Sequence, residues 1–143
     1  MNIQIFNQGN RHDIPFSVDE IASFLYQHLD QFGDPKTAIL KCIDYVFERG
    51  GFITLGTIDN QLAGVVIMND TGMSGYIPEY ILVYVAVNKQ WRGKSLGKQL
   101  MEAVIENADG NIALHVEPEN PAKRLYERLG FTNKYLEMRL IKK

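Results

Sequence analysis

The sequence predicts an α/β (α+β) fold in a single domain that spans residues 1–143. Apolar residues between positions 17 and 47 recur at helical spacing, whereas those between positions 52 and 87 form runs typical of strands. After position 88, helical and strand patterns alternate. A chain of 143 residues with 45% apolar and 22% charged residues is long enough to bury a core without disulfides or metals.

The first third of the chain reads as a strand followed by two helices. Residues 2–6, NIQIF, alternate in the manner of a strand. Ser17 and Glu20 form a capping box at the start of a helix that Gly-Asp-Pro at residues 33–35 ends. A second helix is expected from about residue 35 to 47, because its apolar residues repeat at helical spacing.

Strands follow once the period changes after Gly50-Gly51. The expected strands are residues 52–59, 61–69 and 80–87, with a hairpin turn at Asp59-Asn60. The remaining elements are a helix over residues 96–108, a strand over 111–117, a helix opened by Asn120-Pro121 and ended by Gly130, and a strand over 135–141.

Charge is distributed unevenly along the chain. The net charge of −2 argues against a nucleic-acid binder. Residues 1–75 hold nine acidic and four basic residues, a balance of −5, and residues 76–143 hold eight acidic and eleven basic residues, a balance of +3. The second half is therefore the place to expect an anionic ligand, and the first half either suits a cationic ligand or is a solvated surface.

Several classes of protein are not indicated by the sequence. It contains neither an apolar stretch of membrane-spanning length nor a signal-peptide pattern, so we expect a cytoplasmic protein with no membrane partner. The single cysteine, Cys42, provides neither an intrachain disulfide nor a cluster of metal ligands, so no metal is expected. His28 lies on or beside the apolar face of its helix and is expected to pack there or lie at the surface.

A Gly-Lys-Ser sequence at residues 93–95 joins a predicted strand to a predicted helix. A nucleotide-triphosphate P-loop requires a further glycine five residues before Gly93, where this chain has Asn88. The bulky Trp91 and Arg92 also do not suit a loop that wraps a phosphate closely. The P-loop interpretation is therefore rejected.

The stretch Arg92-Gly-Lys-Ser-Leu-Gly97 resembles instead the pyrophosphate-binding loop of the GCN5-related N-acetyltransferases (GNAT), whose pattern is Arg/Gln-x-x-Gly-x-Gly/Ala. YILVYVAV is similar to the family's fourth strand, IALHVE to its fifth, and ENPAKRLYERLGF to its tyrosine-bearing helix. The resemblance extends from Tyr80 to Phe131. It implies a mostly antiparallel mixed sheet flanked by helices, with a splayed central strand pair that binds acyl-CoA.

The chemistry of the loop agrees with an anionic ligand. The backbone N–H groups at the start of a helix have no intrahelical acceptors and converge with the positive end of the helix dipole. The departure from the motif is Ser95, which stands where the family has its first glycine and makes close approach of the ligand less free. The expected cofactor-binding loop residues are Arg92, Gly93, Lys94, Ser95, Leu96, Gly97 and Lys98.

The resemblance assigns further cofactor contacts outside the loop. It implies that backbone groups of Val85, Ala86 and Val87 receive the pantetheine and the thioester oxygen. Asn120 resembles a cofactor-contacting asparagine, although it stands six residues before the tyrosine where many relatives have seven, and it equally suits a helix cap. Lys123 is expected to reach a CoA phosphate or to form an exposed ion pair.

Three residues are candidates for proton transfer. The family commonly keeps a tyrosine hydroxyl near the CoA sulfur, which here is Tyr126, although this residue also lies on an apolar helical face. His115 occupies the strand position where ribosomal-protein alanine acetyltransferases carry a glutamate, and otherwise it is structural. Glu79 is an even number of residues before Val85, so the side chains of both residues would lie on the same face of the strand. Glu79 is therefore the alternative base, acting through water.

The sequence thus predicts an N-acetyltransferase that transfers the acetyl group of acetyl-CoA to a primary amine of a small molecule or a protein. The alternative is a CoA-binding regulatory or interaction module with little turnover. The acceptor is expected to lie among the N-terminal helices and the loop of residues 69–79. We expect a monomer or homodimer.

Overall fold

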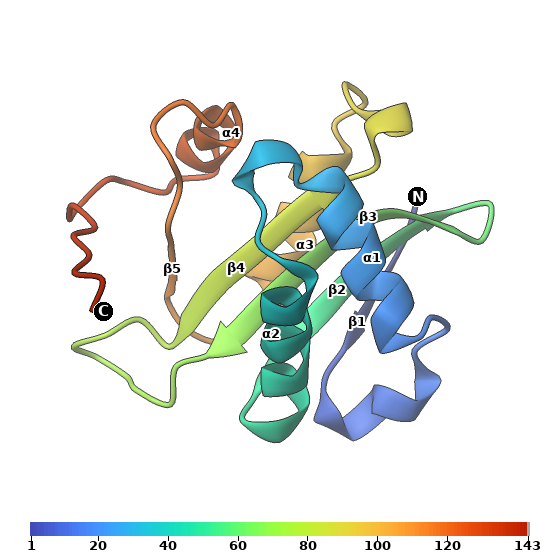
Figure 1. The fold of residues 1–143 in the computed structure, drawn as a ribbon, viewed down its shortest axis with the longest axis horizontal. Helices are drawn as coiled ribbons and strands as arrows, with labels where there is room; N and C mark the ends of the chain where they lie inside the picture. Colours follow the sequence, from blue (N-terminus) through green and yellow to red (C-terminus); the bar gives the residue numbers. More distant parts are fainter. Residues whose placement is uncertain (143) are drawn as a thin grey trace.

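Five strands form one sheet in the order β1-β2-β3-β4-β5 in the computed structural model, which describes residues 1–142 (Figure 1). The first four strands pair in antiparallel fashion, and β5 lies parallel to β4. The strands are β1 (Asn2–Phe6), β2 (Gly51–Ile58), β3 (Gln61–Asp70), β4 (Tyr80–Val87) and β5 (Ile112–Leu114). This arrangement confirms the mixed, mostly antiparallel α/β fold.

Helices cover both faces of this sheet. In Figure 1, α1 and α2 lie in front of the strands and α3 lies behind them. The buried side chains of α3 and α4 belong to one cluster, which packs on the face of the sheet opposite to α1 and α2. The helices are α1 (Val18–His28), α2 (Lys36–Glu48), α3 (Leu96–Asn107) and α4 (Ala122–Arg128).

Local sequence signals set the predicted ends of several elements. The capping box at α1 is formed, since the Glu20 N–H donates to Ser17 Oγ and the Ser17 N–H donates to Glu20 Oε1, both at 3.0 Å. Asp59 and Asn60 have φ angles of 51° and 63°, which a two-residue type I′ hairpin turn requires. The turn joins β2 to β3 as predicted.

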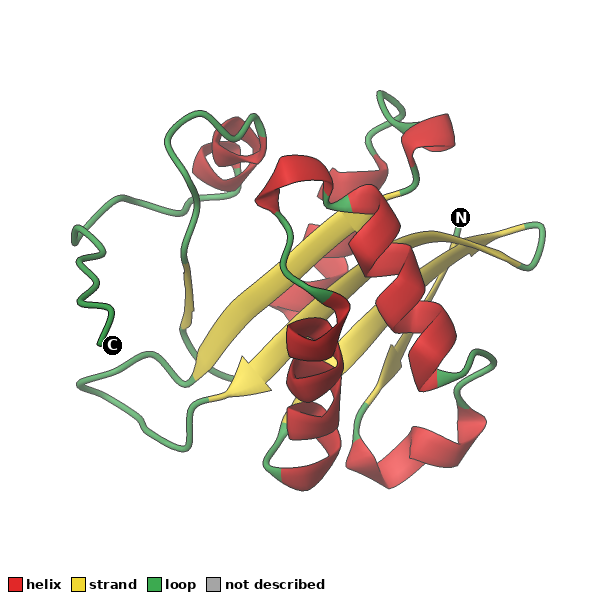
Figure 2. Ribbon diagram, in the orientation of Figure 1, coloured by secondary structure: helices red, strands yellow, loops and turns green. Residues whose placement is uncertain are grey.

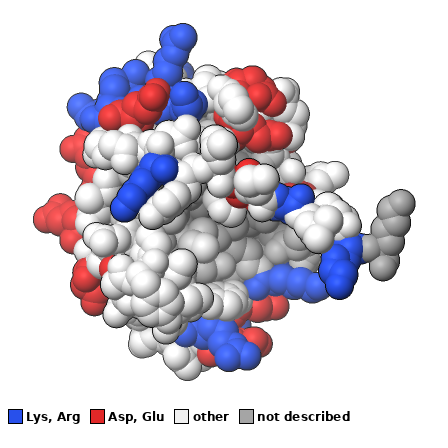
Figure 3. Space-filling view, turned by 90° about the vertical axis from the view of Figure 1, so that its left-hand side faces the viewer, with Lys and Arg blue, Asp and Glu red and all other residues white. Residues whose placement is uncertain are grey.

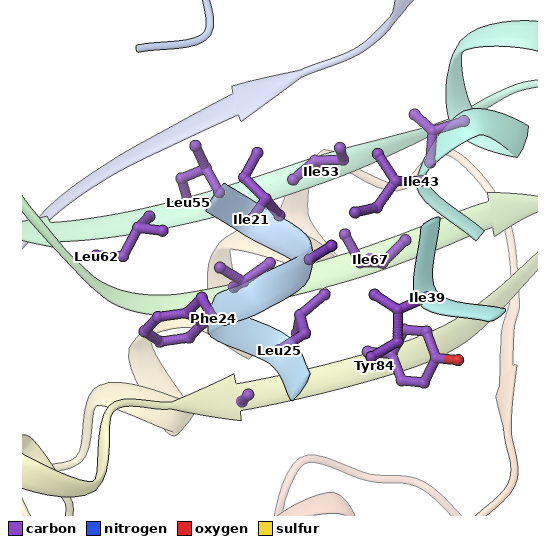
Figure 4. Close-up of a cluster of buried hydrophobic side chains, with 14 of the residues drawn as sticks. Ile21, Phe24, Leu25, Ile39, Ile43, Ile53, Leu55, Leu62, Ile67 and Tyr84 are labelled. Atoms are coloured by element: carbon purple, nitrogen blue, oxygen red, sulfur yellow. The ribbon is translucent and has the colours of Figure 1, made fainter. Parts of the chain in front are cut away.

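The core under α1 and α2 takes side chains from strands β1 to β4, and Figure 4 shows those of β2, β3 and β4. Tyr84 is the polar member of this cluster that lies nearest the site described below, and its hydroxyl points out of the cluster. This hydroxyl donates to Asp34 Oδ2 at 2.5 Å, and burial together with this hydrogen bond raises the pKa of Tyr84. The loop between α1 and α2 is therefore fastened above β4.

The core under α3 depends on a close approach of this helix to the sheet. Leu100 is fully buried in α3, and Gly64 lies beneath it in β3. A Cβ atom at Gly64 would overlap the Leu100 side chain, so a larger residue there would push the helix away from the sheet. The position of the start of α3 thus follows from how closely it packs on β3.

The last two predicted strands differ from the structure. The strand predicted over residues 111–117 is reduced to Ile112–Leu114. The strand predicted over residues 135–141 is wrong, because residues 131–142 contain neither helix nor strand (Figure 2). The alternation is present in this segment, but Leu136 and Met138 are 82% and 89% exposed, and a strand without a pairing partner is not stable.

Candidate functional site

Strands β4 and β5 separate shortly after they meet. They pair only at Tyr80 with Ile112, Ile81 with Ala113 and Leu82 with Leu114. The separation coincides with a β-bulge in β4: Leu82 pairs with Met68 and Tyr84 with Ile67, so that Val83 is the extra residue. A bulge bends its strand and increases the local twist, which explains why β4 turns away from β5 beyond Leu82.

The separated part of β4 contains the three residues expected to contact the cofactor through their backbone. On the β3 side, Val85, Ala86 and Val87 remain paired. On the β5 side they face no strand within the described residues. The Ala86 side chain lies in the core under α1 and α2, and those of Val85 and Val87 pack against the core under α3, so the backbone groups on the β5 side are the polar groups that this part of β4 offers to a ligand.

The loop of residues 92–97 lies at the end of β4 and leads into α3. Gly93 and Ser95 both have left-handed backbone conformations, with φ of 83° and 63°. The first helical hydrogen bond is donated by the Gln99 N–H to the Ser95 carbonyl, so the N–H groups of residues 96–98 have no acceptor within the helix. These amides form an anion-binding arrangement at the positive end of the α3 dipole.

A pocket of about 330 Å³ lies against this loop. Besides the loop and the start of α3, it is lined by Val87 of β4 and by Leu125 and Arg128 of α4. Gly97 lies where these three elements converge, since a Cβ atom there would be 3.4 Å from Leu125 Cδ2 and 3.8 Å from Val87 Cγ2. The pocket thus lies between the loop, the end of β4 and α4, next to the part of β4 that has separated from β5.

The cations near the pocket differ in their partners. Lys98 is 4.0 Å from Glu102 and Lys123 is 3.8 Å from Glu127, both in exposed i,i+4 pairs that are weak and leave these ammonium groups available. Lys94 has no ion-pair partner within residues 1–142. Arg92, in contrast, makes three contacts with other parts of the chain that are described below.

Tyr126 projects from α4 into the core under α3. Its ring is 8% exposed and lies edge-on to Phe131 with 5.8 Å between ring centroids. Burial raises the pKa of Tyr126 to about 12, so the hydroxyl keeps its proton at neutral pH. Among residues 1–142, no hydrogen-bond partner contributes to the pKa of this hydroxyl, which burial alone raises.

Asn120 and Lys123 lie beside a second depression, of about 430 Å³, at the start of α4. Asn120 Oδ1 accepts a hydrogen bond from the Ala122 N–H at 2.9 Å, although the N-cap position of α4 is taken by Pro121, one residue later than predicted. Capping is one of the two roles predicted for Asn120, and its contact with the cofactor stays a prediction.

His115 and Glu79 lie at different places along the edge of the sheet, His115 beyond the end of β5 and Glu79 before the start of β4. His115 itself is exposed, whereas Leu114 and Val116 on either side of it pack against the cluster that contains Tyr126. Both catalytic roles stay predictions.

Glu79 has partners of its own at the start of β4. It accepts hydrogen bonds from the Asn111 N–H at 2.7 Å and from the Gly75 N–H at 3.1 Å, and these bonds lower its pKa. It precedes Val85 by six residues, which is roughly 20 Å along an extended strand. These contacts connect the β3–β4 loop to the turn before β5.

Two contributions to the site escaped the sequence analysis. Asp30 pairs with Arg92 of the loop of residues 92–97 and with Lys89 just before it, and Asp34 accepts the hydrogen bond of Tyr84. Both lie in the connection between α1 and α2, where no spacing relates them to residues 84–92. The uneven charge of the two halves was the available signal, but it does not identify individual residues.

Two wider properties bear on the kind of site. Within residues 1–142, no three His, Cys, Asp or Glu side chains are grouped closely enough to hold a metal ion. Among the same residues, no helix combines the length and apolar character needed to cross a bilayer.

Solved structures with the same fold include several acetyltransferases. A ribosomal-protein-alanine N-acetyltransferase from Brucella melitensis biovar Abortus 2308 has a TM-score of 0.68 and 18% identity, with 99% of this chain and 100% of that chain covered. The aminoglycoside N-acetyltransferase AAC(6')-Iy in complex with CoA has a TM-score of 0.69 and 18% identity, with 99% and 93% covered. A probable acetyltransferase has a TM-score of 0.72 and 16% identity, with both chains fully covered at 100%.

No curated protein sequence matches the chain at a significant level. The model of the acetyltransferase (GNAT) domain family matches residues 45–133, which is more than half of the chain. The matched region contains the bulged strand β4, the loop of residues 92–97 and the tyrosine-bearing helix α4. The chain therefore belongs to the GNAT acetyltransferase family.

Proposed function

We propose that this protein is an N-acetyltransferase that uses acetyl-CoA to acetylate a primary amine of a small molecule or a protein. The observation that carries the proposal is the opening between β4 and β5, which pair over only three residues and separate at the Val83 bulge. The loop of residues 92–97 lies at the end of this opening, on the same strand that would present backbone groups to the thioester.

The pyrophosphate of CoA would bind at the loop. Its oxygens accept hydrogen bonds from the free N–H groups of residues 96–98, and Lys94 and Lys98 add positive charge. The pantetheine would then follow β4 past Val87 and Val85, taking the place of the missing β5 partner by pairing with backbone groups. This path brings the thioester toward the bulge.

Tyr126 would act on the leaving group. The amine nitrogen attacks the thioester carbonyl carbon, the carbon–sulfur bond breaks, and the sulfur leaves as a thiolate. A phenol with a pKa of about 12 is a weaker acid than a thiol, so Tyr126 would keep its proton and stabilise the thiolate by donating a hydrogen bond. Burial alone raises this pKa, with no hydrogen-bond partner among residues 1–142 contributing to it, so the hydroxyl would be available to donate to the sulfur. The proton that the attacking amine loses balances the charge of the released thiolate.

The acceptor amine would enter from the face of α1 and α2. On this face, Tyr84 of the separated part of β4 donates a hydrogen bond from its hydroxyl to Asp34, and His115 is exposed just beyond the end of the neighbouring strand β5. His115 is therefore our candidate to take the amine proton. Glu79 is less suited, because its carboxylate is held by two backbone N–H groups at the far end of β4.

The face that carries β5, α4 and the C-terminal segment is a further candidate for contact with an acceptor. Figure 3 shows this face hollowed at its centre and lined there by uncharged side chains. The C-terminal segment exposes several apolar residues, namely Tyr135, Leu136, Met138 and Leu140. An acceptor with apolar groups next to its amine would gain most from this surface.

The proposal is tested by release of free CoA thiol. The protein is incubated with acetyl-CoA and separately with an aminoglycoside, a peptide that begins with alanine, and a simple diamine. These acceptors span the substrate classes named for two structural relatives. Amine-dependent release of thiol supports the enzyme. Tight binding of acetyl-CoA without release of thiol in the presence of any amine supports the alternative of a CoA-binding regulatory or interaction module. Absence of acetyl-CoA binding contradicts both the enzyme and the regulatory module.

A further inference from the structure

The end of α1 and the cofactor loop meet in a cluster of four polar residues that the proposed chemistry does not use. The guanidinium of Arg92 donates from Nη2 to the His28 carbonyl at 2.6 Å, from Nη1 to Asp30 Oδ2 at 2.9 Å, and from Nε to the Val87 carbonyl at 3.1 Å. Arg92 thus has acceptors in three places: the end of α1, the turn after it and the end of β4.

Asp30 is the centre of this cluster. Its second oxygen, Oδ1, lies 2.9 Å from Lys89 Nζ. One carboxylate therefore pairs with Arg92, the first residue of the loop, and with Lys89, which precedes the loop. The backbone of Asp30 is left-handed, with φ of 56°, a conformation that aspartate tolerates better than most residues. Hydrogen bonds from Lys89 and then Arg92 lower the pKa of Asp30, so the carboxylate is ionised at neutral pH.

His28 holds the same segment from below. Its side chain is buried against Phe24, with 4.5 Å between ring centroids, and Nδ1 accepts the backbone N–H of Lys89 at 3.2 Å. An imidazole nitrogen accepts a hydrogen bond only when it carries no proton, so this contact requires neutral His28. The loop is therefore connected to α1 through both side chains, His28 and Asp30.

We propose that His28 and Asp30 are positioning residues that hold the cofactor loop in its binding conformation, with Arg92 as the connection rather than as a phosphate ligand. The inference rests on the proposed function, since it concerns how the same loop binds acetyl-CoA. Three of the five donors of Arg92 already have acceptors in the chain, and its planar fork is fixed by them. The pyrophosphate then relies on the amides of residues 96–98.

Substitution of Asp30 tests whether Arg92 binds the phosphate or connects the loop to α1, because the two roles predict opposite changes in acetyl-CoA affinity. If Arg92 binds the phosphate, Asp30 competes for it, and Asp30→Asn should strengthen acetyl-CoA binding. If Asp30 positions the loop, Asp30→Asn should weaken binding by roughly three- to tenfold, the range for a partly exposed charged pair. Asp59→Asn is the matched control, because Asp59 is also left-handed but lies in the β2–β3 turn.

Substitution of Arg92 by lysine gives a second comparison. A lysine keeps the positive charge that a phosphate ligand needs but cannot donate to three acceptors in one plane. Positioning therefore predicts that Arg92→Lys weakens binding nearly as much as Arg92→Ala. It also predicts that the double variant Asp30→Asn, Arg92→Lys is no weaker than the worse single variant, because the two residues act through one contact.

The pH dependence of binding reports the contact made by His28. The groups that face its imidazole are Arg92, Lys89 and Asp30, together with the ring of Phe24. Burial, followed by the charges of Arg92 and Lys89, lowers the pKa of His28 below 6.5. As the pH falls through that lowered pKa, Nδ1 gains a proton that opposes the Lys89 N–H, so acetyl-CoA affinity should fall.

His28→Asn tests this pH dependence, since the side-chain oxygen of asparagine can accept the hydrogen bond of the Lys89 N–H but does not titrate. Phosphate groups of acetyl-CoA titrate equally with both proteins, so the difference between wild type and variant isolates His28. Binding is measured by calorimetry from pH 8 to about pH 5, with kcat and KM recorded for the preferred amine. The expected changes lie in the Kd and KM for acetyl-CoA, with kcat at saturation nearly unchanged.

The outcomes separate this inference from the proposed function. Wild-type protein that does not bind acetyl-CoA overturns the proposed function and the inference with it. Wild-type protein that binds, together with an Asp30→Asn variant of equal or higher affinity, overturns the inference alone. Weaker binding by Asp30→Asn, unchanged binding by Asp59→Asn and a pH-dependent difference abolished by His28→Asn establish it.

Discussion

Ser95 stands where the family pattern has a glycine. Its backbone conformation is one that glycine adopts more easily, so the substitution should have a measurable effect on stability. Its φ and ψ angles are 63° and 21°, so a side chain occupies a left-handed position directly before α3. The left-handed conformation costs a residue with a Cβ atom about 1–2 kcal/mol. Ser95 forms no side-chain cap to the helix, so no hydrogen bond within the helix offsets this cost.

Ser95→Gly should therefore stabilise the protein. Removal of the strain gains about 1–2 kcal/mol, and the greater freedom of glycine in the unfolded chain takes back about 0.4–1 kcal/mol. The net gain of about 0.5–1 kcal/mol corresponds to a rise in Tm of roughly 2–4 °C for a chain of this size. Thermal unfolding followed by circular dichroism measures it.

Gly93→Ala is the reciprocal variant in the same loop. Gly93 has a φ of 83°, and a Cβ atom there would meet nothing within 4 Å, so only the backbone conformation opposes the alanine. The expected loss is about 0.5–1 kcal/mol, equal and opposite to the gain at Ser95. Ser95→Ala, which keeps the strain, should change Tm little. Equal Tm values for Ser95→Gly and Ser95→Ala would refute the strain at this position.

Four further predictions concern the chemistry. Tyr126→Phe should lower kcat by roughly 10² while acetyl-CoA affinity and Tm stay near wild type, and unchanged turnover where chemistry limits the rate would return Tyr126 to a packing role. His115→Gln should remove the acidic limb of the pH–rate profile, and a limb that instead follows the basicity of the amine argues against this base. Glu79→Gln should leave kcat nearly unchanged but lower stability, whereas a large loss of kcat without loss of stability would make Glu79 the base. Cys42 is partly buried, and burial raises the pKa of its thiol to about 12, so alkylation at pH 8 should be slower in the folded than in the unfolded protein, and equal rates would contradict the raised pKa.

The part of the fold that local signals determine was predicted from the sequence. The capping box at Ser17, the hairpin turn at Asp59-Asn60 and the period of the β2–β4 strands act within a few residues of the elements they define. The family pattern from Tyr80 to Phe131 was found for the same reason, since strand, loop and helix follow one another in the chain.

Features that depend on distant pairing were not predicted. The alternation of residues 135–141 is a propensity for a strand, but a strand forms only where another edge accepts its hydrogen bonds. The bulge at Val83 is likewise invisible in YILVYVAV, because it exists only as a shift in register against β3. A register is a property of two segments, and a single segment does not contain it.

The arrangement of the candidate site follows from this combination of local and distant effects. The loop sequence prepares an anion-binding start for α3, but the packing of Leu100 over Gly64 decides where this start lies relative to β4. The Val83 bulge then turns β4 away from β5, so the backbone beyond it is open on the side that α4 faces. The same shift in register directs the Tyr84 ring into the core under α1 and α2. Its hydroxyl donates a hydrogen bond to Asp34 at the edge of that core. One extra residue in β4 thus separates the surface that would hold acetyl-CoA from the surface by which an acceptor would arrive, and any substitution that removes the bulge should affect both together.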